Sequence, residues 1–379
     1  MEDKLFTLAF LPPRAEIETT AVLRKMAIAH RYLAELKGMA ATIPNETILI
    51  NTLVLQEAKD SSAIENIITT HDELYKAQLF GNFYKNASAK EVSRYADAMK
   101  QGFQLTRKQK ILSNAHILQI QKILEQNDAG YRKLPGTKLL NEATGETVYI
   151  PPQNFDAIQN LMENLVDYIN NDELSDVDPL VKMAIIHYQF ESIHPFYDGN
   201  GRTGRIINIL YLVLKDLLNL PILYLSRYII RNKSSYYRLL QEVRDNNNWE
   251  GWILYILDGV EQMAKETIIT ISKMRDLMKF YKHTIRRELP KIYSQDLLNN
   301  LFRHPYTKID FLMNELQVSR LTATKYLDQL VQLELLEKQK IWKTNYYINP
   351  SLFQLFMYHD VEKEPSLRIT TVNPDHENK

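Results

Sequence analysis

The sequence predicts a mainly α-helical protein, and two observations lead to this. Glycine is scarce, because the chain of 379 residues holds only 11, whereas glycine normally makes up about 7% of a protein. Apolar residues recur at helical spacing through long stretches rich in Leu, Ile, Lys and Glu. Two short regions favour strands instead, one around residue 140 and one after residue 333. We therefore expect a helical bundle with a β-hairpin, followed by a C-terminal winged helix-turn-helix.

The composition is that of a globular protein without a dominant charge. Hydrophobic residues make up 45% and charged residues 24%, and Lys+Arg and Asp+Glu both total 46. This balance gives no general attraction to nucleic acid or membrane. The first residues lack the layout of a signal peptide, and the most apolar stretch, Ile209–Leu225, is interrupted by two charged residues and Pro221. Without cysteine, disulfides and thiolate zinc sites are excluded. We expect a cytoplasmic protein with no membrane partner.

The N-terminal region is predicted to be helical from Ile17 to about Gln126, with breaks near Pro44 and Gly81. Within it we predict one helix over Ser62–Leu79, because four residues recur there at helical spacing: Glu65, Ile68, Asp72 and Tyr75. The polar run at 127–130 ends this region.

The clearest strand signal follows this break. Lys138–Leu140 and Thr147–Ile150 flank a polar turn that contains Gly145, and two prolines end the segment. Two short strands around a glycine-containing turn predict a β-hairpin.

Further helices are predicted at Asn154–Tyr168, Pro179–Ile193, Arg202–Leu218, Ser234–Arg244 and Trp249–Arg287. Pro290 is a natural boundary. After it, the helices and strands expected of a winged helix-turn-helix are Gln295–Phe302, Lys308–Leu316, Ser319–Leu333, Leu335–Lys343 and Lys343–Ile348. This organisation predicts an N-terminal region 1–110, a core 111–289, a winged helix 290–350 and a tail 351–379, of which Glu362–Lys379 is expected to be disordered.

One run of twelve residues, His194 to Arg205, holds three of the glycines. Pro195 disfavours helix for the preceding residue, so the helix before it ends at His194. Gly199, Asn200 and Gly201 supply left-handed backbone positions and bare N–H groups, as anion-binding loops do. A helix then begins near residue 202 and directs its positive end to the same place.

The side chains of this run suit phosphate chemistry. Arg202 and Arg205 lie three apart, hence on one helix face, and can both reach phosphate oxygens. Asp198 is an oxygen ligand of the kind that Mg²⁺ prefers. His194 can accept a hydroxyl proton near neutral pH. Each feature alone is also found in ordinary turns and solvated helix faces, and the prediction depends on their combination.

The run closely resembles the signature of the Fic family, His-x-Phe-x-Asp/Glu-Gly-Asn-Gly-Arg-x-x-Arg, and meets every fixed position. The resemblance implies a helical core over roughly Leu112–Leu257 and transfer of AMP from ATP, with Mg²⁺, to a Tyr, Ser or Thr hydroxyl of a target protein. It implies that His194 is the base, Asp198 the magnesium ligand, and Phe196 a core anchor. The implied nucleotide-binding residues are Gly199, Asn200, Gly201, Arg202, Thr203, Gly204 and Arg205.

The run Ser61–Asn66 resembles the inhibitory motif of the same family, Ser/Thr-x-x-x-Glu-Gly/Asn. The resemblance implies that Ser61 and Glu65 hold Arg205, so that a carboxylate takes the partner of the ATP γ-phosphate. The alternative is a capping box at a helix start, since Ser62 and Glu65 also fit Ser-x-x-Glu.

Two further features resemble parts of Fic proteins. The hairpin around Gly145 is similar to the flap that docks the target as an added strand, and an ordinary surface hairpin is the alternative. Tyr236 and Tyr237 resemble the aromatic pair that borders adenine, and a core or surface role is the alternative.

Other functions were weighed against AMP transfer. His187, Glu191 and His194 could form a metal triad, which the helix end at Pro195 disfavours. The C-terminal module could bind DNA through Arg320, Lys325 and the lysines of 338–343. Relatives that move phosphate, UMP or phosphocholine offer a third alternative. From the family resemblance we also expect self-modification and a homodimer.

Overall fold

The computed structural model describes residues 8–80, 86–140, 144–341 and 344–357. Helices dominate these ranges, as predicted. The N-terminal helices are α1 Thr20–Ala40, α2 Glu46–Ile64, α3 His71–Phe80, α4 Ala87–Gln109 and α5 Asn114–Glu125. The central helices are α6 Phe155–Asn170, α7 Pro179–Ile193, α8 Asn200–Leu214, α9 Leu225–Arg231, α10 Lys233–Asn246 and α11 Trp249–Glu288. The C-terminal helices are α12 Gln295–Arg303, α13 Ile309–Leu316, α14 Arg320–Gln332 and α15 Pro350–Met357.

The described strands form two small antiparallel sheets. In the first, β1 (Leu139–Leu140) pairs with β2 (Thr147–Tyr149), which is the predicted hairpin; residues 141–143 of its predicted turn lie outside the described ranges. In the second, β5 (Thr344–Ile348) lies between β3 (Tyr306–Lys308) and β4 (Glu337–Ile341).

Helix α7 lies at the centre of the bundle and packs against α6, α8 and α11. All of its residues from Leu180 to Ile193 are buried, because apolar residues occupy nearly every face of this helix. The next helix, α8, comes close to it at Gly204, where an added Cβ would lie 3.0 Å from the Phe190 ring. This close approach fixes the loop between α7 and α8.

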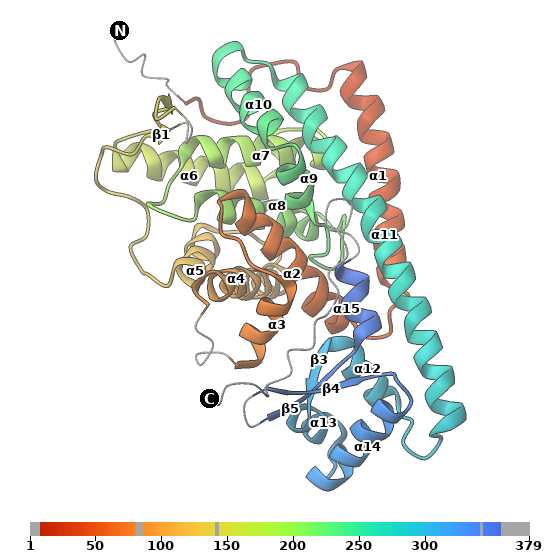
Figure 1. Cartoon of the computed structure of the whole chain (residues 1–379). Helices are drawn as coiled ribbons and strands as arrows, with labels where there is room; N and C mark the ends of the chain where they lie inside the picture. Colours follow the sequence, from red (N-terminus) through yellow and green to blue (C-terminus); the bar gives the residue numbers. More distant parts are fainter. Residues whose placement is uncertain (1–7, 81–85, 141–143, 342–343, 358–379) are drawn as a thin grey trace.

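Helix α11 connects the bundle to the C-terminal domain along one side of the molecule, with α1 beside it (Figure 1). Lys25 contacts Glu261, and Arg275 approaches Met39 further along both helices. The two helices therefore run in the same direction.

The predicted helix over Ser62–Leu79 is wrong. Helix α2 ends at Ile64, and α3 begins only at His71. Asn66 adopts a left-handed conformation, with φ of 62°, which a continuous helix does not allow. Glu65 and Ile68 thus belong to a break in the chain, although their spacing imitates a helix.

The capping box proposed for Ser62 and Glu65 is also wrong, because Glu65 is the C-cap of α2. The reciprocal cap lies before α3 instead. The Thr70 N–H donates to the Glu73 carboxylate at 3.1 Å, and the Glu73 N–H donates to the Thr70 hydroxyl at 3.2 Å.

The C-terminal domain has the predicted order of helices α12, α13 and α14 followed by the β4–β5 hairpin. The prediction of a tail from residue 351 is wrong for its first part, because Leu352 and Phe356 of α15 are buried. Asn349 fixes the start of this helix and accepts a hydrogen bond from Tyr281 of α11 at 2.8 Å. The expected disorder of 362–379 lies outside the described residues.

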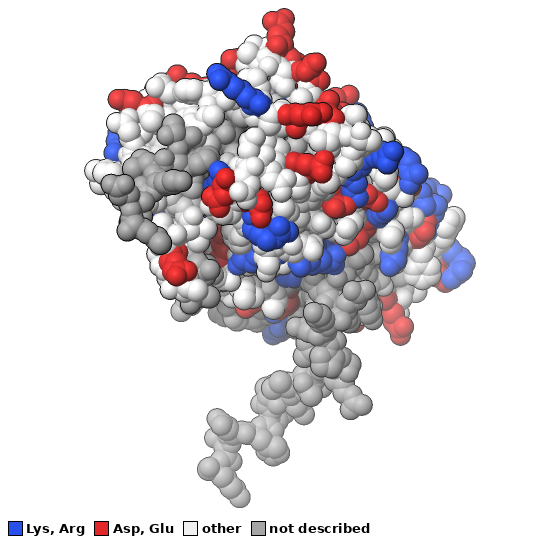
Figure 2. All heavy atoms as spheres, turned by 90° about the horizontal axis from the view of Figure 1, so that it is seen from above, with Lys and Arg blue, Asp and Glu red and all other residues white. Residues whose placement is uncertain are grey.

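Two cations that could serve DNA binding already contact carboxylates. Arg320 lies 3.1 Å from Asp310, and Lys338 lies 2.8 Å from Asp328. Figure 2 looks down on the helical bundle from above the view of Figure 1, and acidic and basic side chains are intermixed on that face. DNA binding therefore stays a prediction. Within the described ranges, no helix combines the length and apolar character that a bilayer crossing demands.

Candidate active site

The loop between α7 and α8 is held by one amide side chain. His194 ends α7 with φ of 49°, as Pro195 predicts. The Asn200 carbonyl oxygen accepts from the Phe196 N–H, and its amide nitrogen donates to the Phe196 carbonyl, both at 2.8 Å. Phe196 is buried against Tyr131, with ring centroids 5.4 Å apart. The Asn200 side chain is thus used inside the loop, and the Gly199 N–H donates to Asp198 Oδ1 at 2.7 Å.

Gly199 is the residue at which the chain turns into α8. Its φ is 76°, and the helix begins at Asn200, earlier than predicted. An added Cβ on Gly199 would collide with the Glu125 carboxylate, and one on Gly201 would lie 2.7 Å from Glu65 Oε1. Two carboxylates therefore lie against the bare glycines of the loop.

Arg205 is buried and contacts the end of α2. Its Nε donates to Ser61 Oγ at 2.7 Å, and its Nη2 donates to the Ser61 carbonyl at 3.1 Å and to Glu65 Oε1 at 2.6 Å. Burial opposes the positive charge, but the carboxylate of Glu65 raises the pKa of Arg205 overall. The arginine is therefore a fixed cation.

Arg202 is 2% exposed and lies among four carboxylates. Its guanidinium nitrogens are 2.7 Å from Glu65 Oε2, 2.5 Å from Glu91 Oε1, 3.0 Å from Glu125 Oε1 and 3.7 Å from Asp198 Oδ1. Glu65 thus bridges Arg202 and Arg205, one oxygen to each. The two guanidiniums share one binding position at the first turn of α8.

Two acidic groups near these arginines, Glu125 and Glu191, bind protons more tightly than usual. Burial raises the pKa of Glu125 to about 7, against the effect of Arg202. Burial also raises the pKa of Glu191 to about 7, against the effect of Arg205. A site with this excess of carboxylates attracts cations and repels phosphates. To bind here, phosphates must displace some of the carboxylates from the arginines.

The His194 imidazole has the properties of a proton acceptor. Burial, with the nearby Arg132 and Arg244 cations, lowers the pKa of His194 to about 4, although Asp198 raises it. Arg132 also fixes the backbone here, since its Nε donates to the His194 carbonyl at 2.8 Å. Asp198 thus acts on the imidazole and also lies 3.7 Å from Arg202, so the three belong to one site.

The hairpin is anchored beside His194. The buried Tyr149 hydroxyl of β2 donates to the Ser192 carbonyl at 2.8 Å, and the Arg244 guanidinium lies 3.9 Å from the centre of the Tyr149 ring. Val148, in the same strand, is 44% exposed. The hairpin thus presents its surface next to the base.

The two tyrosines of α10 differ in their surroundings. Tyr236 is buried, and its hydroxyl contacts His187 Nε2 at 2.9 Å. Tyr237 is 50% exposed and meets the Tyr236 ring edge-on, with centroids 5.1 Å apart. The core role considered for Tyr236 is therefore observed, and Tyr237 remains the candidate for contact with adenine.

The metal triad considered for His187, Glu191 and His194 is wrong. Among the described residues, no group of three or more His, Asp or Glu side chains is arranged to hold a metal ion. His187 is a buried core histidine, as the alternative interpretation expected.

Thr203 and Gly204 face the bundle. Thr203 is fully buried, and an added Cβ on Gly204 would lie 2.7 Å from Glu191 Oε1. The Thr203 side chain and the space next to Gly204 are thus taken up by packing. Nucleotide binding by these two residues stays a prediction, and it would involve their backbone atoms.

We compared the chain with models of known protein families. The Fic/DOC family matches residues 111–212, and the Fic/DOC family N-terminal region matches residues 23–104. The chain belongs to the Fic/DOC family. Residues 277–352 match the C-terminal domain described as protein adenylyltransferase SoFic-like. The three matches leave residues 213–276 unmatched, a stretch that includes α9, α10 and most of α11.

This Fic protein is similar to curated relatives and to solved structures. It is 28% identical over 237 residues to a probable protein adenylyltransferase of Aquifex aeolicus, covering 61% of this chain and 65% of the relative. It is 36% identical over 56 residues to the protein adenylyltransferase fic-1 of Caenorhabditis elegans, covering 15% of this chain and 11% of the relative. The chain thus spans less than two thirds of either relative.

The structural comparisons support the fold. A Fic family protein from Desulfovibrio desulfuricans superposes with a TM-score of 0.57 at 21% identity, covering 89% of this chain and 98% of that one. Fic-1 of C. elegans superposes with a TM-score of 0.50 at 17% identity, covering 67% of this chain and 73% of that one.

Three site residues were missed in the sequence. Glu91, Glu125 and Arg132 contact the signature residues from α4, α5 and the segment after α5. Glu91 and Glu125 have no local signal, because each is one acid among many on a helix. Arg132 follows a break and is fully buried, which a sequence pattern does not show.

Proposed function

We propose that this Fic protein is a protein adenylyltransferase that moves AMP from ATP to a hydroxyl side chain. The observation that carries the proposal is the bridge from Glu65 to both Arg202 and Arg205 at the first turn of α8. Two buried guanidiniums, a helix N-terminus and bare glycines form a site for a chain of phosphates. The names of the Aquifex and nematode relatives agree with this activity.

In the proposed reaction, a target hydroxyl is positioned next to the His194 imidazole. The hydroxyl oxygen forms a bond to the α-phosphorus of ATP, its proton passes to His194, and the bond from the α-phosphorus to the bridging oxygen breaks. Pyrophosphate leaves with that oxygen. Arg202 and Arg205, together with the loop N–H groups, stabilise the charge that develops on the phosphates.

Asp198 fits the Mg²⁺ that the family resemblance implies. Its side chain is 74% exposed and only 3.7 Å from Arg202, so a carboxylate oxygen can face a metal–phosphate complex. Mg²⁺ commonly takes one or two carboxylates with phosphates and water. When bound, the ion would neutralise phosphate charge, while Asp198 would hold it.

We propose that the chain is autoinhibited in this state. Glu65 occupies both guanidiniums, and Ser61 takes two further hydrogen bonds of Arg205. Glu125 adds a second obstruction, since its carboxylate lies over Gly199. A triphosphate and these carboxylates compete for the same cations.

The target would dock at the β1–β2 hairpin. Backbone pairing with an exposed strand accepts many sequences, and the anchoring of Tyr149 places this strand next to His194. The chain's own hydroxyls are candidate targets, so self-modification belongs to the same proposal.

Intact-mass analysis of the Glu65→Gly variant after incubation with ATP and Mg²⁺ tests the function. We expect a mass increase of one AMP group on the chain or on an added target protein. An increase of one phosphate, or transfer of UMP from UTP or of phosphocholine from a donor, would assign a different transferase. No modification by any of these donors would refute the proposal.

A further inference from the structure

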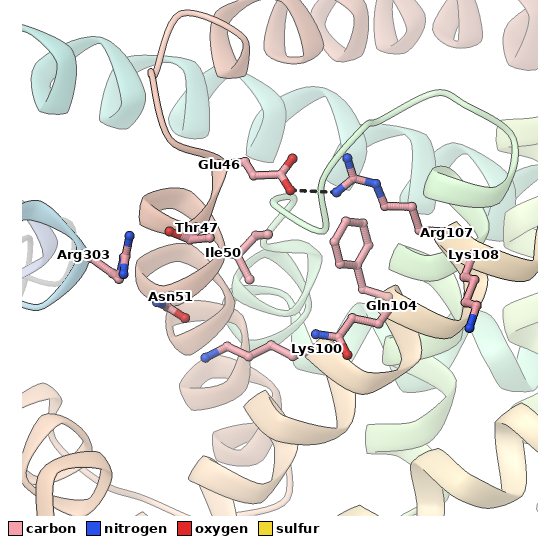
Figure 3. A pocket seen from close by; sticks show the side chains of 10 residues that line it. Glu46, Thr47, Ile50, Asn51, Lys100, Gln104, Arg107, Lys108 and Arg303 are labelled. Atoms are coloured by element: carbon pink, nitrogen blue, oxygen red, sulfur yellow. Dashed lines mark hydrogen bonds and ion pairs between the residues drawn. The ribbon is translucent and has the colours of Figure 1, made fainter. Parts of the chain in front are cut away.

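A cavity of about 520 Å³ lies between the start of α2, the end of α4 and the last residue of α12 (Figure 3). Volumes of about 300–1,000 Å³ are usual for small-molecule sites. The lining residues are Glu46, Thr47, Ile50, Asn51, Lys100, Phe103, Gln104, Arg107, Lys108 and Arg303. None of them belongs to the signature loop or to its partners.

The charges in this cavity do not balance. Four of its lining residues are cationic and one, Glu46, is acidic. Glu46 is paired with Arg107 at 2.8 Å, as Figure 3 shows. Of the other three cations, Arg303 lies 2.9 Å from Glu315, outside the lining, and Lys100 and Lys108 on α4 remain without a carboxylate partner in the lining.

Two of these cations lack a full set of partners. Arg303 donates through Nη1 to Glu315 at 2.9 Å, but its buried Nε has no acceptor among the described residues. Lys100 is partly buried, and no carboxylate of the described chain lies within 4 Å of its ammonium. Burial lowers the pKa of Lys100, and Asp97 only partly offsets this. An anion in the cavity would relieve both groups.

The remaining wall suits a small ligand that carries phosphate. Asn51 and Gln104 add amide donors to the lining, and Ile50 and Phe103 add apolar side chains. The Thr47 hydroxyl already donates to Asn45 Oδ1 at 2.7 Å. Several cations on opposite walls suit a multiply charged anion better than a single carboxylate.

We propose that this cavity is a second anion site, separate from the catalytic loop, which binds a phosphate-bearing small molecule such as pyrophosphate or the phosphates of a nucleotide. It is separate from the catalytic site, because Lys100 and Glu91, the acid that contacts Arg202, are nine residues apart on α4, or roughly 13–14 Å at 1.5 Å per helical residue. Binding here does not depend on the proposed transferase activity.

The test is calorimetric titration of the full chain with inorganic pyrophosphate and, separately, with ADP. In the Arg205→Ala variant, which loses a cation of the catalytic loop, we expect pyrophosphate binding to persist. In Arg205→Ala combined with Lys100→Met, we expect affinity to fall at least tenfold. Lys108→Met, at an exposed position, should cause a smaller loss, and Lys291→Met, an exposed lysine outside the cavity, should change nothing.

The two ligands distinguish the source of the phosphate. Binding of ADP that shares the Lys100 dependence indicates a nucleotide site, and binding of pyrophosphate alone indicates a site for the free anion. Binding that disappears with Arg205→Ala, or that is unaffected by Lys100→Met, would overturn the proposal. So would the absence of binding by both ligands in the Arg205→Ala variant.

Discussion

The Glu125 carboxylate lies 3.0 Å from Nη2 of Arg202 and against the bare α-carbon of Gly199. Glu65 lies in the same way between Arg202 and Gly201. Each acid thus lies against an arginine and a glycine that the phosphates of ATP would have to contact in order to bind. The family motif accounts for Glu65 only, so Glu125 is a second acid in the position that we propose for a phosphate.

Glu125→Gln should strengthen ATP binding. The neutral amide retains the size of the side chain but removes a charge beside the phosphates, and the loss of one hydrogen-bonded charge is worth about 1.5–3 kcal/mol. We expect the KM for ATP to fall by up to about tenfold at pH 8, where a carboxyl with a pKa of about 7 is ionised, and by less at pH 6, with little change in kcat. Glu163→Gln, at an exposed position of α6, is the matched control. An unchanged KM in steady-state assays would show that Glu125 does not oppose the nucleotide.

Glu65→Gly should raise the rate of transfer. The change frees Arg202 and Arg205 together, because Glu65 bridges them at 2.7 and 2.6 Å. With interactions of about 1.5–3 kcal/mol at stake, we expect an increase between tenfold and a hundredfold, measured with α-phosphate-labelled ATP. Glu65→Gln, which can still contact Ser61 and Arg205, should give a smaller increase. Equal rates for wild type and Glu65→Gly would contradict the inhibitory role.

His194→Ala should remove transfer without unfolding the chain. A general base contributes about 10²–10⁴ to the rate, and the loop is held by Asn200 and Arg132 rather than by the imidazole. The comparison is made in the Glu65→Gly background, where activity is highest. The melting temperature serves as the control, and label transfer equal to the parent's would exclude His194 as the base.

The sequence predicts the catalytic loop well because local chemistry determines it. Pro195 ends α7 at His194, and Gly199 takes the left-handed conformation that starts α8. These effects act within a few residues and need no knowledge of the fold. The arginines then follow at helical spacing on one face.

The break after α2 was not predicted, and the surrounding carboxylates could not be. The apolar spacing continues across Asn66, so periodicity alone suggests one helix, although the capping box of Thr70 and Glu73 was visible in the sequence. Glu91 reaches Arg202 from 111 positions away. Only the packing of α4 and α5 against α8 brings such residues to the site.

The pH dependence of transfer should differ from that of a free histidine. Burial and two cations lower the pKa of His194 to about 4. The imidazole therefore stays neutral down to a lower pH than a histidine with the usual pKa of about 6.5. The acid limb of kcat/KM in the Glu65→Gly variant should therefore lie near pH 4. A limb at about 6.5 would contradict this environment for the imidazole.

The same shift affects folding stability with a defined sign. The folded pKa lies below the unfolded value, so the unfolded chain binds more protons between about pH 4 and 6.5. The contribution of His194 is present above pH 6.5 and is lost as pH falls through 4. In urea unfolding, His194→Ala should therefore lose less stability than wild type between pH 6.5 and 4.5, and equal losses would exclude the effect.

Gly204→Ala should destabilise the bundle, because α7 and α8 approach too closely at this position for a side chain. The added Cβ would lie 2.7 Å from Glu191 Oε1 and 3.0 Å from the Phe190 ring, and overpacking of this kind costs about 1–3 kcal/mol. Gly38→Ala in α1 is the matched control, since its Cβ meets nothing within 4 Å. It should stabilise the helix by about 0.5–1 kcal/mol. Thermal unfolding should thus shift in opposite directions for the two variants, and a stable Gly204→Ala protein would mean that α7 and α8 can separate without cost.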